Sequence, residues 1–120
     1  MSPEQIFLGT NEAYVSNIRR RKGRMRGLWT PDAAEALRHA AYCSVNFSPC
    51  VVIADFRPDL FYRVDESKAF SLMSRAHVSV SVFSEAQLHD FAVKYNVSDA
   101  TYSDAIRQIK KTRRLDNAHA

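Results

Sequence analysis

Positively charged residues gather at two places in this sequence, and their spacing suits the binding of a polyanion. Six cations lie between residues 19 and 26, and five more lie between residues 107 and 114 with no acid among them. The net charge of +4 is mild, so these local clusters matter more than the total. They favour a partner with a phosphate backbone and leave an acidic protein as the other option. The cations are Arg19, Arg20, Arg21, Lys22, Arg24 and Arg26 in the first cluster and Arg107, Lys110, Lys111, Arg113 and Arg114 in the second.

The sequence gives little support to catalytic or metal-binding chemistry. Cys43 and Cys50 match no common zinc spacing, and no further cysteine pair could complete a site. His39 precedes Cys43 by one helical turn, but a single His and Cys in an alanine-rich helix are typical of packing or surface roles. With 3 glycines the chain has no phosphate-cradling loop, and no histidine is paired with a nucleophile at motif spacing. We expect neither an enzyme nor a metal or other cofactor.

Length and composition indicate one globular unit. The chain has 120 residues, of which 46% are hydrophobic and 11% aromatic, enough for one modest core. No apolar run is long enough for a signal peptide or a membrane span. We expect a single domain over 1–120 in a reduced, cytoplasmic protein, with an N-terminal interaction region over 1–82 and a functional unit over 83–115.

The C-terminal third has the pattern of two helices joined by a tight turn. Ser84 and Gln87 have the capping-box spacing that opens a helix. Asn96 can adopt the left-handed backbone that the turn needs, and Ser98 can cap the next helix. Two helices that cross steeply need a small residue at their contact, which Ala92 supplies. The apolar residues at helical spacing, which we expect in the core, are Leu88, Phe91, Ala92, Tyr95, Val97, Tyr102, Ala105, Ile106 and Ile109.

The string FAVKYNVSDATYSDAIR, from Phe91 to Arg107, closely resembles the helix-turn-helix of many bacterial and phage regulators. In that family the second helix enters the major groove of DNA. A weaker likeness, to the middle-operon activators of transposable phages, comes from the C-terminal position of this unit and the basic stretch over 110–114. Those proteins pair a dimerising N-terminal region that contains a strand with a C-terminal reader.

The resemblance implies a set of contacts with double-stranded DNA. The residues that would face the major groove are Ser98, Asp99, Ala100, Thr101, Ser103, Asp104 and Arg107. The residues that would lie near phosphates are Lys94, Lys110, Lys111, Arg113 and Arg114. The basic run over 19–26 is either a flexible arm that follows the phosphate backbone or the minor groove, or a solvated helix end.

The function that the resemblance implies is a sequence-selective, DNA-binding regulator of transcription from a bacterium, phage or plasmid. One unit makes few base contacts, so we expect a homodimer formed through the region from about Pro31 to Val82, with RNA polymerase as a candidate protein partner. Asp99 and Asp104 place negative charge on the presumed reading face. They favour the alternative, a small protein-binding adaptor or inhibitor that uses this scaffold without binding DNA. A continuous basic face joining the two cationic clusters would favour DNA.

The elements expected before this unit make the fold α+β and mostly helical. A short helix is predicted over 2–9, ended by Gly9, and a second over 13–22. A third helix is predicted over 30–44, with Thr30 as its N-cap.

The strands are expected in the middle of the chain. The segments 50–54 and 60–64 are rich in β-branched or aromatic residues and predict a hairpin. A helix is then predicted to start at 65–67 and to include 69–73. The alternating segment 77–82 predicts either a third strand or an extended connector.

Overall fold

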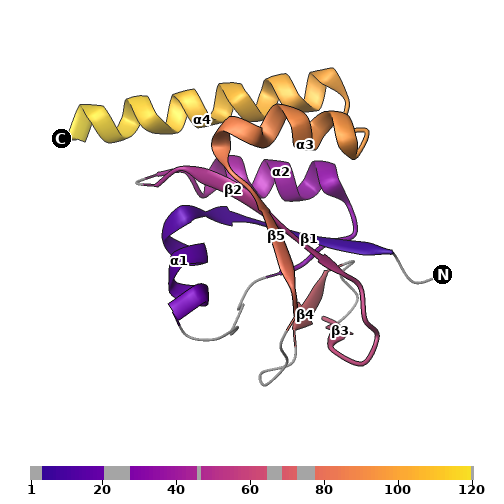
Figure 1. The fold of residues 1–120 in the computed structure, drawn as a ribbon. Coiled ribbons are helices and arrows are strands. Elements are labelled where there is room, and N and C mark those ends of the chain that lie inside the picture. The colour runs from indigo at the N-terminus through magenta and orange to yellow at the C-terminus, as the bar shows by residue number, and fades with distance from the viewer. Residues whose placement is uncertain (1–3, 21–27, 46, 65–68, 73–77, 120) are drawn as a thin grey trace.

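The computed structural model describes residues 4–20, 28–45, 47–64, 69–72 and 78–119 (Figure 1). These residues form a mixture of helix and antiparallel sheet, as the sequence predicts. None of their helices is both long and apolar enough to cross a membrane. The elements in chain order are β1 (Gln5–Asn11), α1 (Glu12–Arg20), α2 (Ala33–Tyr42), β2 (Pro49–Asp55), β3 (Phe61–Arg63), β4 (Phe70–Leu72), β5 (Val80–Phe83), the 3-10 helix η1 (Glu85–Gln87), α3 (Leu88–Lys94) and α4 (Asp99–His119).

The main sheet has three antiparallel strands in the order β1-β2-β5. The central strand β2 is buried from Pro49 to Ala54, because both of its faces are covered. A continuous β-branched apolar run is typical of such a strand, and the prediction of a strand here is confirmed. The alternating segment also forms a strand, β5, over Val80–Phe83.

A second, two-stranded sheet is joined to the main sheet by two residues. β3 pairs with β4, and the main chain of Trp29 exchanges hydrogen bonds with that of Phe70 at 2.7 and 2.8 Å. The next residue, Thr30, does the same with Phe7 of β1, at 2.8 Å in both directions. The short segment at Trp29 and Thr30 therefore continues the main sheet into the β3–β4 hairpin.

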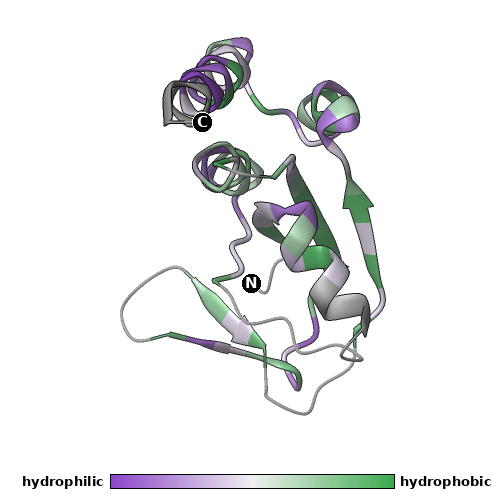
Figure 2. Cartoon of the chain, turned by 90° about the vertical axis from the view of Figure 1, so that its left-hand side faces the viewer, coloured by the Kyte–Doolittle hydropathy of each residue, from purple (hydrophilic) through white to green (hydrophobic). Residues whose placement is uncertain are grey.

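The two faces of the main sheet support different layers (Figures 1 and 2). Side chains alternate along β2, so Val52 faces one side and its neighbour Val51 the other. Val52 packs with Trp29 and with Val15 of α1, so α1 and the β3–β4 hairpin cover this face. Val51 packs with residues of α2, α3 and α4, which cover the opposite face. We call these the hairpin layer and the helix layer.

Gly9 in β1 allows α2 to lie directly on the sheet. A Cβ atom at this position would lie 2.0 Å from the carbonyl oxygen of Ala36 and 2.7 Å from the main-chain nitrogen of Ala40. Ala36 and Ala40 are themselves fully buried, so small residues line both sides of the contact. The prediction of a helix over 2–9 is wrong: Gly9 is a close-approach residue inside a strand and ends no helix.

Three other predictions in the N-terminal two thirds are wrong. The N-cap of α2 is Asp32, whose carboxylate accepts from Ala34 N and Glu35 N, whereas Thr30 Oγ1 only accepts from Asp32 N. β2 and β3 do not form a hairpin, because β2 pairs with β1 and β5 while β3 pairs with β4. The helix predicted over 69–73 is a strand at Phe70–Leu72, where backbone hydrogen bonds to Trp29 and β3 outweigh the apparent cap at 65–67. Residues 65–68 and 73 lie outside the described residues.

The turn between α3 and α4 has the local geometry that the sequence predicts. Asn96 has φ of 58°, in the left-handed region, and Val97 N donates to the Ala92 carbonyl at 2.9 Å. Gln87 Oε1 accepts from Ser84 N at 3.0 Å, which is one half of the capping box. The steep crossing is not found. α3 and α4 run in opposite directions in Figure 1, and both are viewed nearly end-on in Figure 2, as α2 is.

Candidate nucleic-acid interface

One side of α4 is packed against the rest of the protein. Ala105 and Ile109 are each 3% exposed and join the core of the helix layer, and Thr112 is 8% exposed. The Thr112 hydroxyl donates to the Gln108 carbonyl at 2.8 Å, so this buried polar group is satisfied within the helix. These residues recur at the three-to-four-residue spacing of a helix face, which holds α4 in a fixed rotation.

The other side of α4 faces solvent and carries the second cationic cluster. Arg107, Lys110 and Arg114 recur at helical spacing along this outer side, with Lys111 beside them. Lysine and arginine side chains on one face of a helix produce a positive potential that a polyanion can follow. The exposed residues of this side are Asp99, Ala100, Ser103, Asp104, Arg107, Lys110, Lys111, Arg113 and Arg114.

The acid at the centre of this side is paired with a neighbouring arginine. Asp104 Oδ1 lies 3.0 Å from Arg107 Nη1, and the two side chains are 69% and 77% exposed. An exposed pair one turn apart contributes about 0.5 kcal/mol at most. The pair can therefore open easily when a phosphate competes for Arg107. Asp99 occupies the first turn of α4, where a carboxylate interacts favourably with the helix dipole.

Arg113 has a structural partner. Its guanidinium forms an ion pair with Glu85, at the start of η1, and the hydrogen bond to Glu85 raises the pKa of Arg113. The contact links the C-terminal half of α4 to the beginning of the α3 segment. Arg113 is thus less free to contact a phosphate than Lys110 or Arg114.

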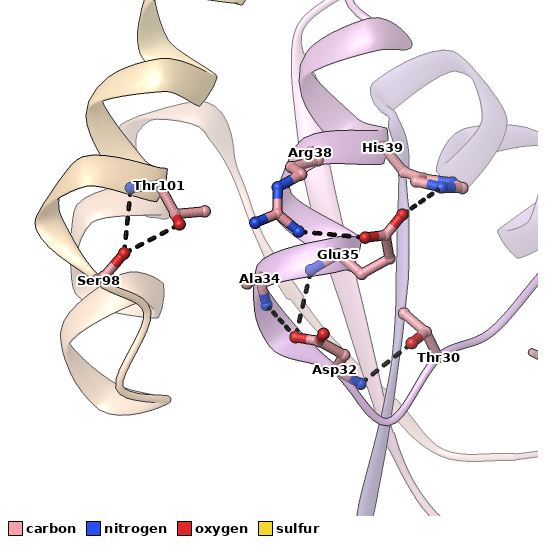
Figure 3. A network of polar contacts seen from close by, with 8 residues as sticks. All are labelled: Thr30, Asp32, Ala34, Glu35, Arg38, His39, Ser98 and Thr101. Carbon is pink, nitrogen blue, oxygen red and sulfur yellow. Dashed lines mark hydrogen bonds and ion pairs between the residues drawn. The ribbon is translucent and has the colours of Figure 1, made fainter. Parts of the chain in front are cut away.

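In the first turn of α4, part of the predicted reading surface faces the rest of the protein. Ser98 caps the helix, with Thr101 N donating to Ser98 Oγ at 3.2 Å, and the Ser98 hydroxyl donates to Thr101 Oγ1 at 2.9 Å. Thr101 is half-buried and lies toward the N-terminal end of α2 (Figure 3). On the preceding helix, Lys94 Nζ lies 5.6 Å from the centre of the Tyr95 ring.

An open groove between α2 and α4 adds two residues that the sequence did not single out. Arg38 and Tyr42 line it from α2, and Asp104, Arg107 and Lys111 line it from α4, around a volume of about 500 Å³. Tyr42 is 67% exposed, so its ring is available to a ligand. The only signal in the sequence was that Arg38 and Tyr42 lie four residues apart, on the side of α2 away from its buried alanines.

Arg38, which lines the groove, has an acidic neighbour on its own helix. Arg38 Nη1 lies 3.2 Å from one oxygen of Glu35, and His39 Nε2 lies 3.2 Å from the other oxygen (Figure 3). Both of these contacts are half-exposed, so they hold the side chains only weakly. Arg38, Arg107 and Lys111 outnumber Asp104 along the lining, so we call it the cationic groove beside the outer side of α4.

The first cationic cluster starts on the other face of the sheet. α1, which ends at Arg20, packs in the hairpin layer, whereas α4 belongs to the helix layer. The side chains of Arg19 and Arg20 and the whole of 21–27, including Arg21, Lys22, Arg24 and Arg26, lie outside the described residues. The residues that the structure describes therefore do not join the two clusters into one basic face.

Comparison with protein-family models, with curated proteins and with solved structures gave no significant match to this chain.

Proposed function

We propose that the protein binds double-stranded DNA through the outer side of α4, with the cationic groove between α2 and α4 holding one flank of the phosphate backbone. The observation that carries the proposal is the exposed row of Arg107, Lys110 and Arg114, with Lys111 beside it, on a helix whose opposite side is packed. An α-helix fits the major groove of DNA, and phosphate contacts from lysine and arginine supply most of the affinity.

The proposal assigns different tasks along α4. Its N-terminal half, with Ala100, Ser103 and Arg107, would lie against base edges, and its C-terminal half, with Lys110 and Arg114, would contact phosphates. The turn at Asn96 and the cap at Ser98 support the presentation of α4, although α3 and α4 do not cross steeply as the two helices of the regulators that the sequence resembles do. Because α4 packs along α2 and α3 does not cross it, α4 itself is the part that would enter the groove.

The biological role that fits such an interface is regulation of transcription. A single helix reads few bases, so two copies on a two-fold symmetric site would be needed for selective binding. The two copies would place two α4 helices on successive turns of the major groove. RNA polymerase would be a candidate partner for a protein bound beside a promoter.

Fluorescence anisotropy with random-sequence duplex DNA over a salt series tests the proposal. We expect binding at low salt with a steep salt dependence. The double variant Lys110→Ala/Lys111→Ala should bind more weakly and with a flatter dependence, by about 0.9 in log–log slope for each phosphate that it no longer neutralises. The matched control is Arg57→Ala/Arg63→Ala, which removes two exposed cations from the β2–β4 region and should change nothing. Failure of the wild-type protein to bind at low salt would exclude the proposal.

A protein-binding adaptor is the second candidate function. Two observations favour it: the cationic clusters start on opposite faces of the sheet, and the exposed aromatic rings of Tyr42 and Phe47 lie near the end of α2. Exposed aromatic residues are enriched at protein–protein interfaces. An affinity pull-down with wild-type protein and with the double variant Tyr42→Ala/Phe47→Ala tests this role. A partner retained only by the wild-type protein, together with no DNA binding, would establish it.

A further inference from the structure

Among the described residues, the main sheet has one open edge. On the β1 side the sheet continues, because Thr30 pairs with Phe7 and Trp29 pairs with Phe70. On the other side β5 is the last strand, and no described element pairs with its outer edge (Figure 2). An open edge presents main-chain N–H and C=O groups to which another strand can bind.

The hydrogen-bond pattern shows which residues of β5 point outward. Phe7 directs its main-chain groups to Thr30, away from β2, so its neighbours Ile6 and Leu8 direct theirs to β2. Leu8 pairs with Val52, and the next residue along β2, Ile53, therefore directs its groups to Ser81 of β5. The alternation along β5 then leaves the main-chain groups of Val80 and Val82 pointing to solvent.

The residues of this edge offer no protection against pairing. The segment 78–83 reads VSVSVF and contains no charge and no proline. At the opposite end of the extended sheet, β3 has three residues, carries the exposed Arg63 and follows Pro58. Charge and proline are features by which edge strands avoid association, so β3 is protected, whereas β5, which is similarly short at four residues, has neither.

We propose that β5 is the dimerisation edge, and that two copies of this chain pair antiparallel through it around a two-fold axis at Ser81. A second copy fits because the outward residues Val80 and Val82 flank Ser81 symmetrically. Val80 of one copy then faces Val82 of the other, and each such pair exchanges both N–H···O=C bonds. Ser81 of one copy lies opposite Ser81 of the other across the axis, and the two three-stranded sheets form one continuous sheet.

The side chains of β5 suit this arrangement. Val80 and Val82 are half-buried and pack against the core of the hairpin layer, so the paired strands would extend this apolar layer across the axis. Ser81 lies on the helix-layer face and is exposed, so it adds no steric obstacle at the centre. An uncharged edge also meets its own copy without like-charge repulsion.

The inference rests on the proposed function only for the expectation of two copies, and it is tested without DNA. Sedimentation over a concentration series should show a dimer, and Ser81→Lys should raise its dissociation constant at least about tenfold, because two lysines would face each other at the axis. Ser16→Lys, at an exposed position of α1, is the charge-matched control and should leave the dimer intact. A monomer at every concentration, or a Ser81→Lys protein as dimeric as the wild type, would overturn the inference.

Cysteine crosslinking tests the register. In a Cys43→Ser background, Ser81→Cys should give a covalent dimer on mild oxidation, because residues at the centre of an antiparallel two-fold pair lie about 4.5–5.5 Å apart. Ser79→Cys, whose partner across the axis would be Phe83, should crosslink poorly. Equal crosslinking of the two variants would contradict an axis at Ser81. If the wild-type protein bound no DNA while Ser81→Cys still formed the crosslink, the proposed function would be excluded and the dimer would stand.

Discussion

At the residue scale, the hydrogen that Gly9 carries in place of a side chain sets the distance between α2 and the sheet. The atoms that a Cβ would meet belong to the main chain of α2, at Ala36 and Ala40, and cannot rotate away. Core overpacking usually costs about 1–3 kcal/mol, and displacement of a helix costs more. We therefore expect Gly9→Ala to lower the free energy of unfolding by about 3 kcal/mol or more in urea titrations. Ser16→Ala, at an exposed site, should change it by less than about 0.5 kcal/mol, and equal stability of the two variants would contradict the close approach.

Also at the residue scale, Asp104 is predicted to weaken DNA binding. Its carboxylate occupies Arg107 at 3.0 Å and adds a negative charge to the surface that would face phosphates. Asp104→Asn should therefore raise the affinity for random-sequence DNA at low salt, as measured by fluorescence anisotropy. Asp59→Asn is the matched control, because Asp59 forms a similar exposed pair with Arg57 at 2.9 Å, away from α4. A lower affinity of Asp104→Asn would indicate that the acid contacts a base directly, as a cytosine amine would allow.

At the element scale, the elements predicted correctly are those whose signals are local. α2, β2 and the helices on both sides of Asn96 follow from caps, apolar periodicity and one left-handed residue. β1 was missed because its residues are buried on both faces and do not alternate, so Gly9 resembled a helix end. β4 was missed because the residues before it resemble a helix cap, and because its second partner, besides β3, is Trp29, 41 positions earlier in the chain, where no local pattern could show the pairing.

For the candidate site, too, the part that depends on local spacing could be predicted from the sequence, and the part that depends on tertiary contacts could not. The row from Arg107 to Arg114 lies on one helix, so its common exposed face follows from helical spacing. Arg38 and Tyr42 belong to the site only because α2 packs beside α4, which is a tertiary contact. The prediction of a steep crossing was wrong because a tertiary contact decides the direction of α4. Ala92 permits a close contact between helices, but the packing of α4 along α2 sets the direction of α4.

The turn between α3 and α4 is the element whose backbone is most restrictive. Asn96 has φ of 58°, a conformation that costs a β-branched residue about 1–2 kcal/mol and costs glycine nothing. We expect Asn96→Gly to be at least as stable as the wild type and Asn96→Val to be less stable by about 1–2 kcal/mol in urea titrations. Because Asn96 is exposed, a change in side-chain packing cannot account for such a difference. Equal stability of the two variants would mean that the left-handed turn is not maintained in solution.

At the scale of the whole molecule, β2 couples the two layers. Val52 contributes to the core of the hairpin layer, and its neighbour Val51 contributes to the core of the helix layer. α4, with the proposed DNA-binding face, is attached to this strand through α2 and the residues around Leu37 and Ile109. A change in the hairpin layer can therefore alter the stability of the interface although it lies on the other side of the sheet.

This coupling predicts that the molecule unfolds as one unit. Trp29 is the single tryptophan and is fully buried in the hairpin layer, so its fluorescence reports that layer, whereas far-ultraviolet circular dichroism reports chiefly the helices. In urea the two signals should have the same midpoint. Leu37→Ala, in the helix layer, should lower both midpoints equally, by an amount corresponding to about 2–5 kcal/mol. If Leu37→Ala lowered only the circular-dichroism midpoint, the helix layer would be an independent unit, and α4 would bind its partner on a scaffold that the sheet does not stabilise.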